Sequence, residues 1–204
     1  MKTYRILGAL VLSGFLSLAT SQAAFNLYGN SNDLGGSSSI SAHFLLGSMV
    51  TLDQTVDLLD AGVIFRNAGY NANIGLYSAD FSNGLPDQLL ATTGSFFVTS
   101  TGTVETPFTT SPTLLPGDYW FMAEYDRDSV SVGFSQTVTN LVAYRSLTFA
   151  TSLPSAFGPA STYTGQAFNY YLVTQSVPEP STYALFGLGA LALVIAATRR
   201  KQKA

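Results

Sequence analysis

Apolar and polar side chains alternate with a period of two through most of residues 24–176, and turn-forming residues separate one alternating run from the next. This alternation is typical of strands with one face in a core, whereas an amphipathic helix needs a 3.6-residue period, which no long window here sustains. Only residues 50–59 are ambiguous. The clearest strands are 39–46, 58–66, 73–78, 95–99, 118–125, 141–149 and 168–174. The pattern predicts an all-β fold, a single two-sheet β-sandwich of the jelly-roll type.

Charge and cysteine content narrow what this segment can be. Most of the basic residues lie near the two ends of the chain, and residues 24–176 keep only Arg66, Arg127 and Arg145, with no lysine. Nearly all of the twelve acidic residues lie in the same segment. Such an acidic domain repels nucleic acids, so nucleic-acid binding is excluded. The absence of cysteine rules out disulfides, a thiol nucleophile and lipid attachment through a cysteine.

The N-terminus predicts a signal peptide over residues 1–23. Lys2 and Arg5 precede an apolar run over 6–18, and small residues follow as far as Ala23. An apolar run of this length is typical of a secretory signal and too short for a spanning helix. We expect signal peptidase to cut between Ala23 and Ala24, with the bond between Ala24 and Phe25 as the neighbouring option, so that the β-sandwich is exported through the inner membrane.

Residues 177–204 form a tail with three parts in order. A proline-rich tetrapeptide comes first and consists of Val177, Pro178, Glu179 and Pro180. An apolar run over 184–197 follows, and then a basic end with Arg199, Arg200, Lys201 and Lys203. Because proline cannot join a strand ladder, we expect the tetrapeptide to be extended and accessible to a processing enzyme. The apolar run predicts a short transmembrane helix with its basic end in the cytoplasm. A permanent single-pass anchor is the alternative to a processed tail.

The order of these three parts resembles the PEP-CTERM sorting signal. Pro178, Glu179 and Pro180 match the recognition triplet of that family, and Arg199 and Arg200 match its basic end. The resemblance implies a protein exported by a Gram-negative bacterium and recognised by an exosortase, a membrane-embedded enzyme similar to cysteine transpeptidases. It also implies that the helix is removed, so that the inner membrane holds the chain only transiently.

The body is similar to the choice-of-anchor β-sandwich domains of bacterial surfaces. The segments that carry this resemblance are 63–65, 73–78, 84–91, 115–120 and 163–171. They are mostly strand and turn motifs, so the resemblance implies a fold and a surface location, and no ligand.

Few residues of the body suggest chemistry. His43 is the sole histidine, and its alternating neighbours predict a half-buried strand position with no role in catalysis. Asp126 and Asp128 flank Arg127 after a predicted strand and could bind Ca²⁺ together with Glu124, although a solvated turn with an Arg127 ion pair is the simpler interpretation. A glycosidase would need two carboxylates at a defined separation, and nothing in the spacing of Glu105, Glu124 and the aspartates of the body selects such a pair.

Aromatic side chains of the second half could stack on sugar rings, but strand alternation predicts that at most about half of them are exposed, so packing in the core is favoured. They are Tyr119, Trp120, Tyr125, Tyr163, Tyr170 and Tyr171. We therefore expect a non-enzymatic protein of the cell surface or extracellular matrix, without a required cofactor, that associates with exopolysaccharide or biofilm. A carbohydrate-binding or carbohydrate-active module is the alternative.

Overall fold

The computed structural model describes residues 24–136, 140–150 and 152–177, together with Gly187 and Gly189. Residues Phe25–Val177 form one compact unit, and the segments before and after them belong to a second unit. The strands described below all lie in the first unit, which is the sandwich domain.

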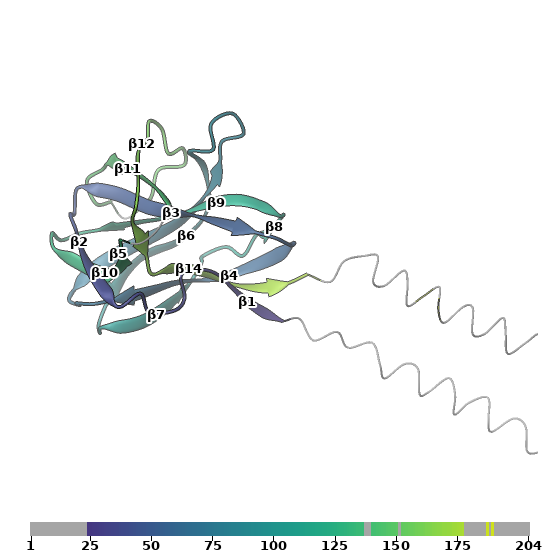
Figure 1. The fold of residues 1–204 in the computed structure, drawn as a ribbon, viewed down its shortest axis with the longest axis horizontal. Coiled ribbons are helices and arrows are strands. Elements are labelled where there is room, and N and C mark those ends of the chain that lie inside the picture. The colour runs from purple at the N-terminus through teal and green to yellow at the C-terminus, as the bar shows by residue number, and fades with distance from the viewer. Residues whose placement is uncertain (1–23, 137–139, 151, 178–186, 188, 190–204) are drawn as a thin grey trace, which may run out of the picture. The chain divides into compact units, whose positions relative to one another are not determined.

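Eight strands form the first sheet, and all of their pairings are antiparallel. Its main path runs β1–β14–β4–β10–β13, with β2 paired to β10 and both β7 and β8 paired to β4 (Figure 1). The strands are β1 (Phe25–Gly29), β2 (Gly36–Ile40), β4 (Val56–Phe65), β7 (Gly102–Pro107), β8 (Thr113–Leu114), β10 (Val130–Ser135), β13 (Ala167–Phe168) and β14 (Tyr170–Ser176). The first and last strands of the domain are thus neighbours, with Phe25 opposite Gln175.

Six strands form the second sheet, in the order β12–β11–β3–β9–β5–β6. They are β3 (Phe44–Leu52), β5 (Tyr70–Ala79), β6 (Pro86–Val98), β9 (Gly117–Tyr125), β11 (Leu141–Ser146) and β12 (Ser161–Thr164). These pairings are antiparallel too. The chain turns from β4 into β5 through Gly69, whose φ of 90° is readily adopted only by glycine.

The main core lies between the two sheets and follows the predicted alternation. β4 contributes Val56, Leu58, Ala61, Val63 and Phe65 to it, and other members come from β5, β9, β10 and β14. Phe121 stacks on Tyr170 with ring centroids 4.9 Å apart, and Tyr170 stacks on Phe168 at 5.4 Å. The prediction of an all-β, two-sheet sandwich is confirmed.

A second core covers the outer face of the six-stranded sheet. Side chains of Leu45, Tyr77, Trp120, Met122 and Ala143 lie there beneath Leu153 and Phe157, which come from the connection between β11 and β12. The same connection accepts a hydrogen bond from the Tyr77 hydroxyl at the Pro154 carbonyl, 2.9 Å away. β9 is therefore buried on both faces. The opposite sheet covers its inner face, and the connection between β11 and β12 covers its outer face.

Several predicted strand limits are wrong. The run 39–46 contains a turn at 41–43 that divides β2 from β3, and the ambiguous run 50–59 contains the turn between β3 and β4. The predicted strand 95–99 is the end of the longer β6, and the strand predicted over 141–149 ends at Ser146. Alternation continues by chance through short turns, so a local pattern misplaces these limits.

Candidate functional site

The last strand of the domain leads directly into the proline-rich tetrapeptide. β14 has β1 on one side and β4 on the other. Its final residue, Ser176, is opposite Val56, and the Val177 N–H donates a hydrogen bond to the Thr55 carbonyl at 3.2 Å. Backbone pairing thus continues to the residue that precedes Pro178. Pro178 cannot donate a further backbone hydrogen bond to a neighbouring strand, since proline has no N–H.

Most residues of the predicted targeting segments lie outside the described residues. These are Ala23, Pro178, Glu179, Pro180, Arg199, Arg200, Lys201 and Lys203. Gly187 and Gly189 of the apolar run are described, and both are helical. Within the described part of the chain, no helix has the length and apolar character that crossing a membrane requires. Ala24 is exposed and directly precedes β1.

A family model described as the PEP-CTERM protein-sorting motif matches residues 176–201. The chain carries a PEP-CTERM sorting motif. The predicted resemblance of the tail is confirmed, and the motif marks the protein as an exosortase substrate that Gram-negative cells export to their surface. The matched segment begins at the final residue of β14, so sandwich and motif share one residue. A search of curated proteins finds no match to the chain.

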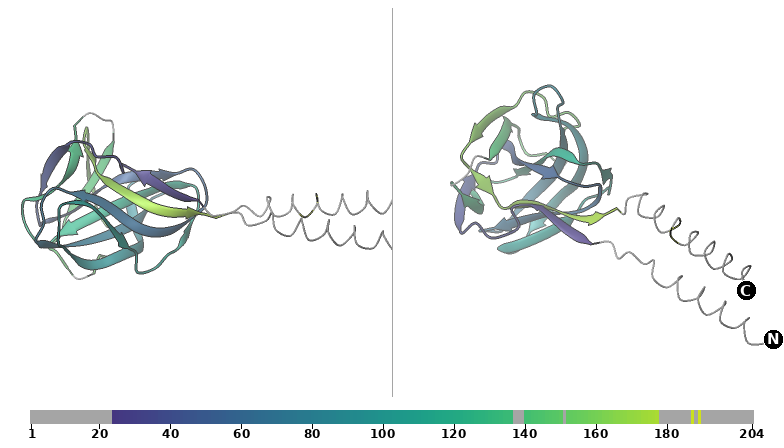
Figure 2. Two further views of the ribbon diagram at one scale, coloured as in Figure 1. Left: turned by 90° about the horizontal axis from the view of Figure 1, so that it is seen from below. Right: turned by 45° about the vertical axis from the view of Figure 1, so that its right-hand side comes forward.

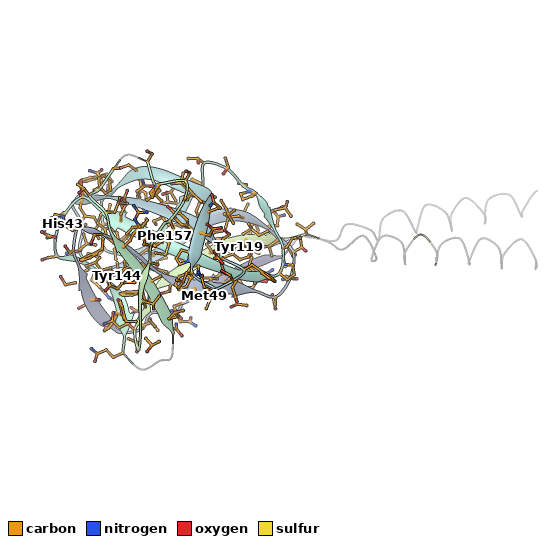
Figure 3. All side chains as sticks on the ribbon, turned by 90° about the horizontal axis from the view of Figure 1, so that it is seen from above. His43, Met49, Tyr119, Tyr144 and Phe157 are labelled. Atoms are coloured by element: carbon orange, nitrogen blue, oxygen red, sulfur yellow. The ribbon has the colours of Figure 1, made fainter. Side chains whose placement is uncertain are left out.

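His43 differs from its predicted environment. It is exposed in the turn between β2 and β3, where its N–H donates to the Ser41 hydroxyl at 3.4 Å. Figure 3 shows His43 near one end of the domain, with Tyr119 toward the other. The half-buried strand position predicted for this histidine is wrong, because the chain leaves the strand at residue 41.

The Asp126 and Asp128 carboxylates accept hydrogen bonds from two different segments of the chain. Asp126 accepts hydrogen bonds from the backbone N–H of Asn71 at 2.8 Å and from the side-chain amide of the same residue. Asp128 accepts from the Ser41 hydroxyl and the Ala42 N–H at 2.8 and 2.9 Å, and these donors lower the pKa of its carboxyl. Over the described ranges, no three metal-ligating side chains are grouped together. Calcium binding by Asp126 and Asp128 stays the alternative hypothesis to these hydrogen-bonded turns.

The simpler interpretation of that turn also needs a correction. The Arg127 guanidinium donates to the Gly69 carbonyl at 3.5 Å, at the entrance of β5. A carboxylate ion pair is instead formed by Arg66 with Asp33, and the pKa of Asp33 is lowered chiefly by that contact. Arg127 thus contacts the turn between β4 and β5.

The six aromatic side chains proposed as a sugar platform do not share one surface. Trp120, Tyr125, Tyr170 and Tyr171 are buried, and Tyr119 and Tyr163 are half-buried. The two buried hydroxyls of Tyr125 and Tyr170 lie 3.0 Å apart in a mutual hydrogen bond within the main core. The prediction that at most about half of these rings are exposed is confirmed.

A separate aromatic row lies across three adjacent strands of the six-stranded sheet. Phe44 of β3 meets Tyr144 of β11 with ring centroids 5.7 Å apart, and Tyr144 meets Tyr163 of β12 at 5.8 Å. All three residues are half-buried. Sequence reasoning singled out only Tyr163, because the register that brings the other two rings beside it is set by strand pairing.

Glu124 is an ionisable residue whose burial the sequence did not predict. Its side chain is fully buried, and one carboxyl oxygen, Oε2, has no hydrogen-bond partner. Oε1 accepts two long hydrogen bonds, from the Asn73 amide at 3.3 Å and the Ala150 N–H at 3.4 Å. Burial raises the pKa of this carboxyl to about 7, and the two donors only partly oppose that effect.

Glu105 lies on the other sheet, in β7, and cannot pair with Glu124. It is opposite Gly62 of β4 and accepts the Tyr171 hydroxyl at 2.8 Å. The adjacent Asp60 has a raised pKa, first because burial penalises its charge and second because Glu105 is near. Gly62 leaves space for the Tyr171 ring, since an added Cβ would lie 2.1 Å from it. The two body glutamates thus belong to different sheets, in separate surroundings.

Proposed function

We propose that this chain is a non-enzymatic protein of the cell surface or extracellular matrix, delivered by its sorting motif and associated with exopolysaccharide. The observation that carries the proposal is the direct continuation of β14 into that motif. The folded sandwich is therefore what sorting delivers. Many of its large aromatic side chains are packed in the cores, and its two glutamates accept hydrogen bonds from other segments of the domain, which supports a structural role.

The route we propose has three steps. The signal peptide takes the chain through the inner membrane, and signal peptidase cuts after Ala23. The sandwich then folds on the periplasmic side while the C-terminal helix holds the chain in the inner membrane. Exosortase removes the helix, and the domain passes to the outer surface or to the matrix. The acidic, lysine-free body suits this destination, because it repels anionic membrane surfaces and stays soluble.

Mass spectrometry of intact protein tests the sorting step. We expect the wild-type protein recovered from the envelope and the medium to begin at Ala24 and to lack the residues after the proline-rich tetrapeptide. Glu179→Ala should retain the helix, since it removes the acidic residue of the recognition triplet. Recovery of wild-type protein with residues 184–204 still attached would instead support a permanent single-pass anchor.

A carbohydrate-binding role is the second candidate, and the row of Phe44, Tyr144 and Tyr163 favours it. Aromatic faces bind sugar rings through apolar contact, and these three contacting rings are partly exposed. On this alternative, Tyr144→Ala should reduce retention of the domain by the producer's own polysaccharide. Phe97→Ala is the matched control, because Phe97 is 57% exposed and no member of the row. Equal retention of both variants would reject the row as a binding site, and release of sugar fragments would contradict the non-enzymatic proposal.

A further inference from the structure

The proline-rich tetrapeptide has no free chain between itself and the folded domain. Gln175 is paired on both sides, with Phe25 of β1 and Asp57 of β4, and Ser176 is paired with Val56. The hydrogen bond from Val177 to Thr55 continues this pairing by one residue. Pro178 follows at once. Figure 2 shows the ends of β1 and β14 side by side at one end of the sandwich.

The same strand limits where the chain can be cut without damage to the domain. β14 lies between two other strands, and its residues Tyr170 and Leu172 are fully within the main core. A cut before Gln175 would remove backbone pairing with both β1 and β4, and a cut before Ser176 would still remove the pairing of Ser176 with Val56 of β4. The scissile bond of a processed and still folded sandwich must therefore lie after Ser176.

A protein that binds an extended peptide by strand addition uses the backbone N–H and C=O groups of that peptide, and proteolytic cleavage prefers exposed chain. Here the residues before the tetrapeptide are the last ones of β14, and their hydrogen-bonding groups are already in use. Binding of the tetrapeptide by an exosortase and complete pairing of β14 thus compete for one stretch of backbone.

We propose that exosortase acts on a chain in which residues 174–177 have separated from β4 and β1, so that opening of this strand end governs the rate of processing. The inference rests on the processing by exosortase proposed above. In the reaction, the enzyme's cysteine sulfur attacks the carbonyl carbon of the scissile bond. A thioester forms, the C–N bond breaks, and the thiol proton goes to the amine of the released helix. Water then hydrolyses the thioester, which frees the domain with a carboxyl end and restores the thiol.

The position of β1 also affects how easily the end of β14 opens. β1 starts at Phe25, directly after Ala24, and Phe25 is paired with Gln175. The predicted signal-peptidase site and the sorting motif therefore adjoin two paired strand ends. β1 is also the edge strand of its sheet, so it is the neighbour of β14 that is itself held from one side only. Strand ends of this kind open far more often than the whole domain unfolds. Cleavage that is slow relative to opening follows the population of the open form.

Two opposite changes in the full-length chain, followed by pulse–chase in the producing cell, test the proposal. The first inserts Gly-Ser-Gly-Ser between Ser176 and Val177 and supplies free backbone without altering β14. The second joins β14 to β4 through Asp57→Cys with Gln175→Cys, which are directly opposite residues. Paired strand residues have Cα separations that a disulfide can bridge, and the chain has no other cysteine to interfere.

We expect the insertion to speed removal of the helix by about tenfold, because the inserted residues spare the enzyme the opening of β14; this factor corresponds to an opening free energy of about 1.4 kcal/mol in the wild-type chain. The disulfide should slow removal by at least about the same factor. Adding the insertion to the disulfide variant should restore fast processing, and either single cysteine variant should behave as wild type. Phe25→Cys with Gln175→Cys, which joins β14 to β1, serves if the first disulfide does not form.

The outcomes separate this inference from the sorting assignment. Unchanged rates for the insertion and for a disulfide confirmed by mass would overturn the opening mechanism, while a block by Glu179→Ala would still uphold exosortase processing. Normal processing of Glu179→Ala would instead overturn the sorting assignment itself.

Discussion

The buried carboxyl of Glu124 predicts an unusual dependence of stability on pH. We consider Glu124→Gln in the domain of residues 24–177, which contains both cores. The carboxyl has a pKa of about 7 in the folded protein against an ordinary value of 4.5. Between these two values the folded domain holds a proton that the unfolded chain has released. A rise in pH through this window therefore favours unfolding.

The size of the effect follows from the same two values. Each pH unit between the two pKa values is worth about 1.4 kcal/mol, so the wild-type domain loses at most about 3 kcal/mol from this group between pH 4.5 and 7. Glutamine keeps the shape and does not ionise. We expect the free energy of unfolding of Glu124→Gln, relative to wild type, to rise by up to about 3 kcal/mol over this range.

Urea unfolding followed by the fluorescence of Trp120 measures this difference at a series of pH values. Trp120 is a suitable probe because it is fully buried in the second core, on the same face of β9 as Glu124. Asp118→Asn is the matched control: it removes an exposed carboxylate of the same strand and should keep the wild-type dependence on pH. Parallel stability curves for wild type and Glu124→Gln would refute the reasoning.

Three further predictions concern the domain. Asn169→Ala should lower the free energy of unfolding by about 3 kcal/mol in urea, since the Asn169 side chain bonds the Asn30 and Asn32 carbonyls and the Leu34 N–H; no loss would show that water replaces it. Tyr77→Phe should cost about 1 kcal/mol by the same measurement, through the lost bond to Pro154, and an unchanged midpoint would argue against a firmly held covering segment. Excess Ca²⁺ should leave the melting temperature unchanged, because the Asp126 and Asp128 carboxylates already accept hydrogen bonds from other segments; a rise that Asp126→Asn abolishes would contradict this.

The domain shows which parts of a β-sandwich a sequence can predict. The strands at 58–66, 73–78 and 118–125 are found where the alternation is strong. The strands β1, β7 and β10 were not singled out, because they are short and are identified mainly by their partners in β14 and β4. The turn at 41–43 was missed for the opposite reason: alternation happens to continue across it.

The candidate site divides in the same way. The motif at residues 176–201 is recognisable because its three parts follow one another along the chain, and no folding is needed to assemble them. The buried Glu124 and the row of Phe44, Tyr144 and Tyr163 depend on contacts between distant segments. Glu124 occupies a position that alternation assigns to the outer face of β9, and only the covering segment removes it from water.

The sequence by itself thus determined the all-β class and the sorted, exported character of the protein, because both depend on patterns local to a few residues. Tertiary structure alone decided that the first and last strands are paired and that β9, in the six-stranded sheet, is buried on both faces. It also decided that backbone pairing continues up to the sorting motif. The physical reason is the same in each case: the groups that satisfy a strand's hydrogen bonds, or cover its outer face, lie far away along the chain.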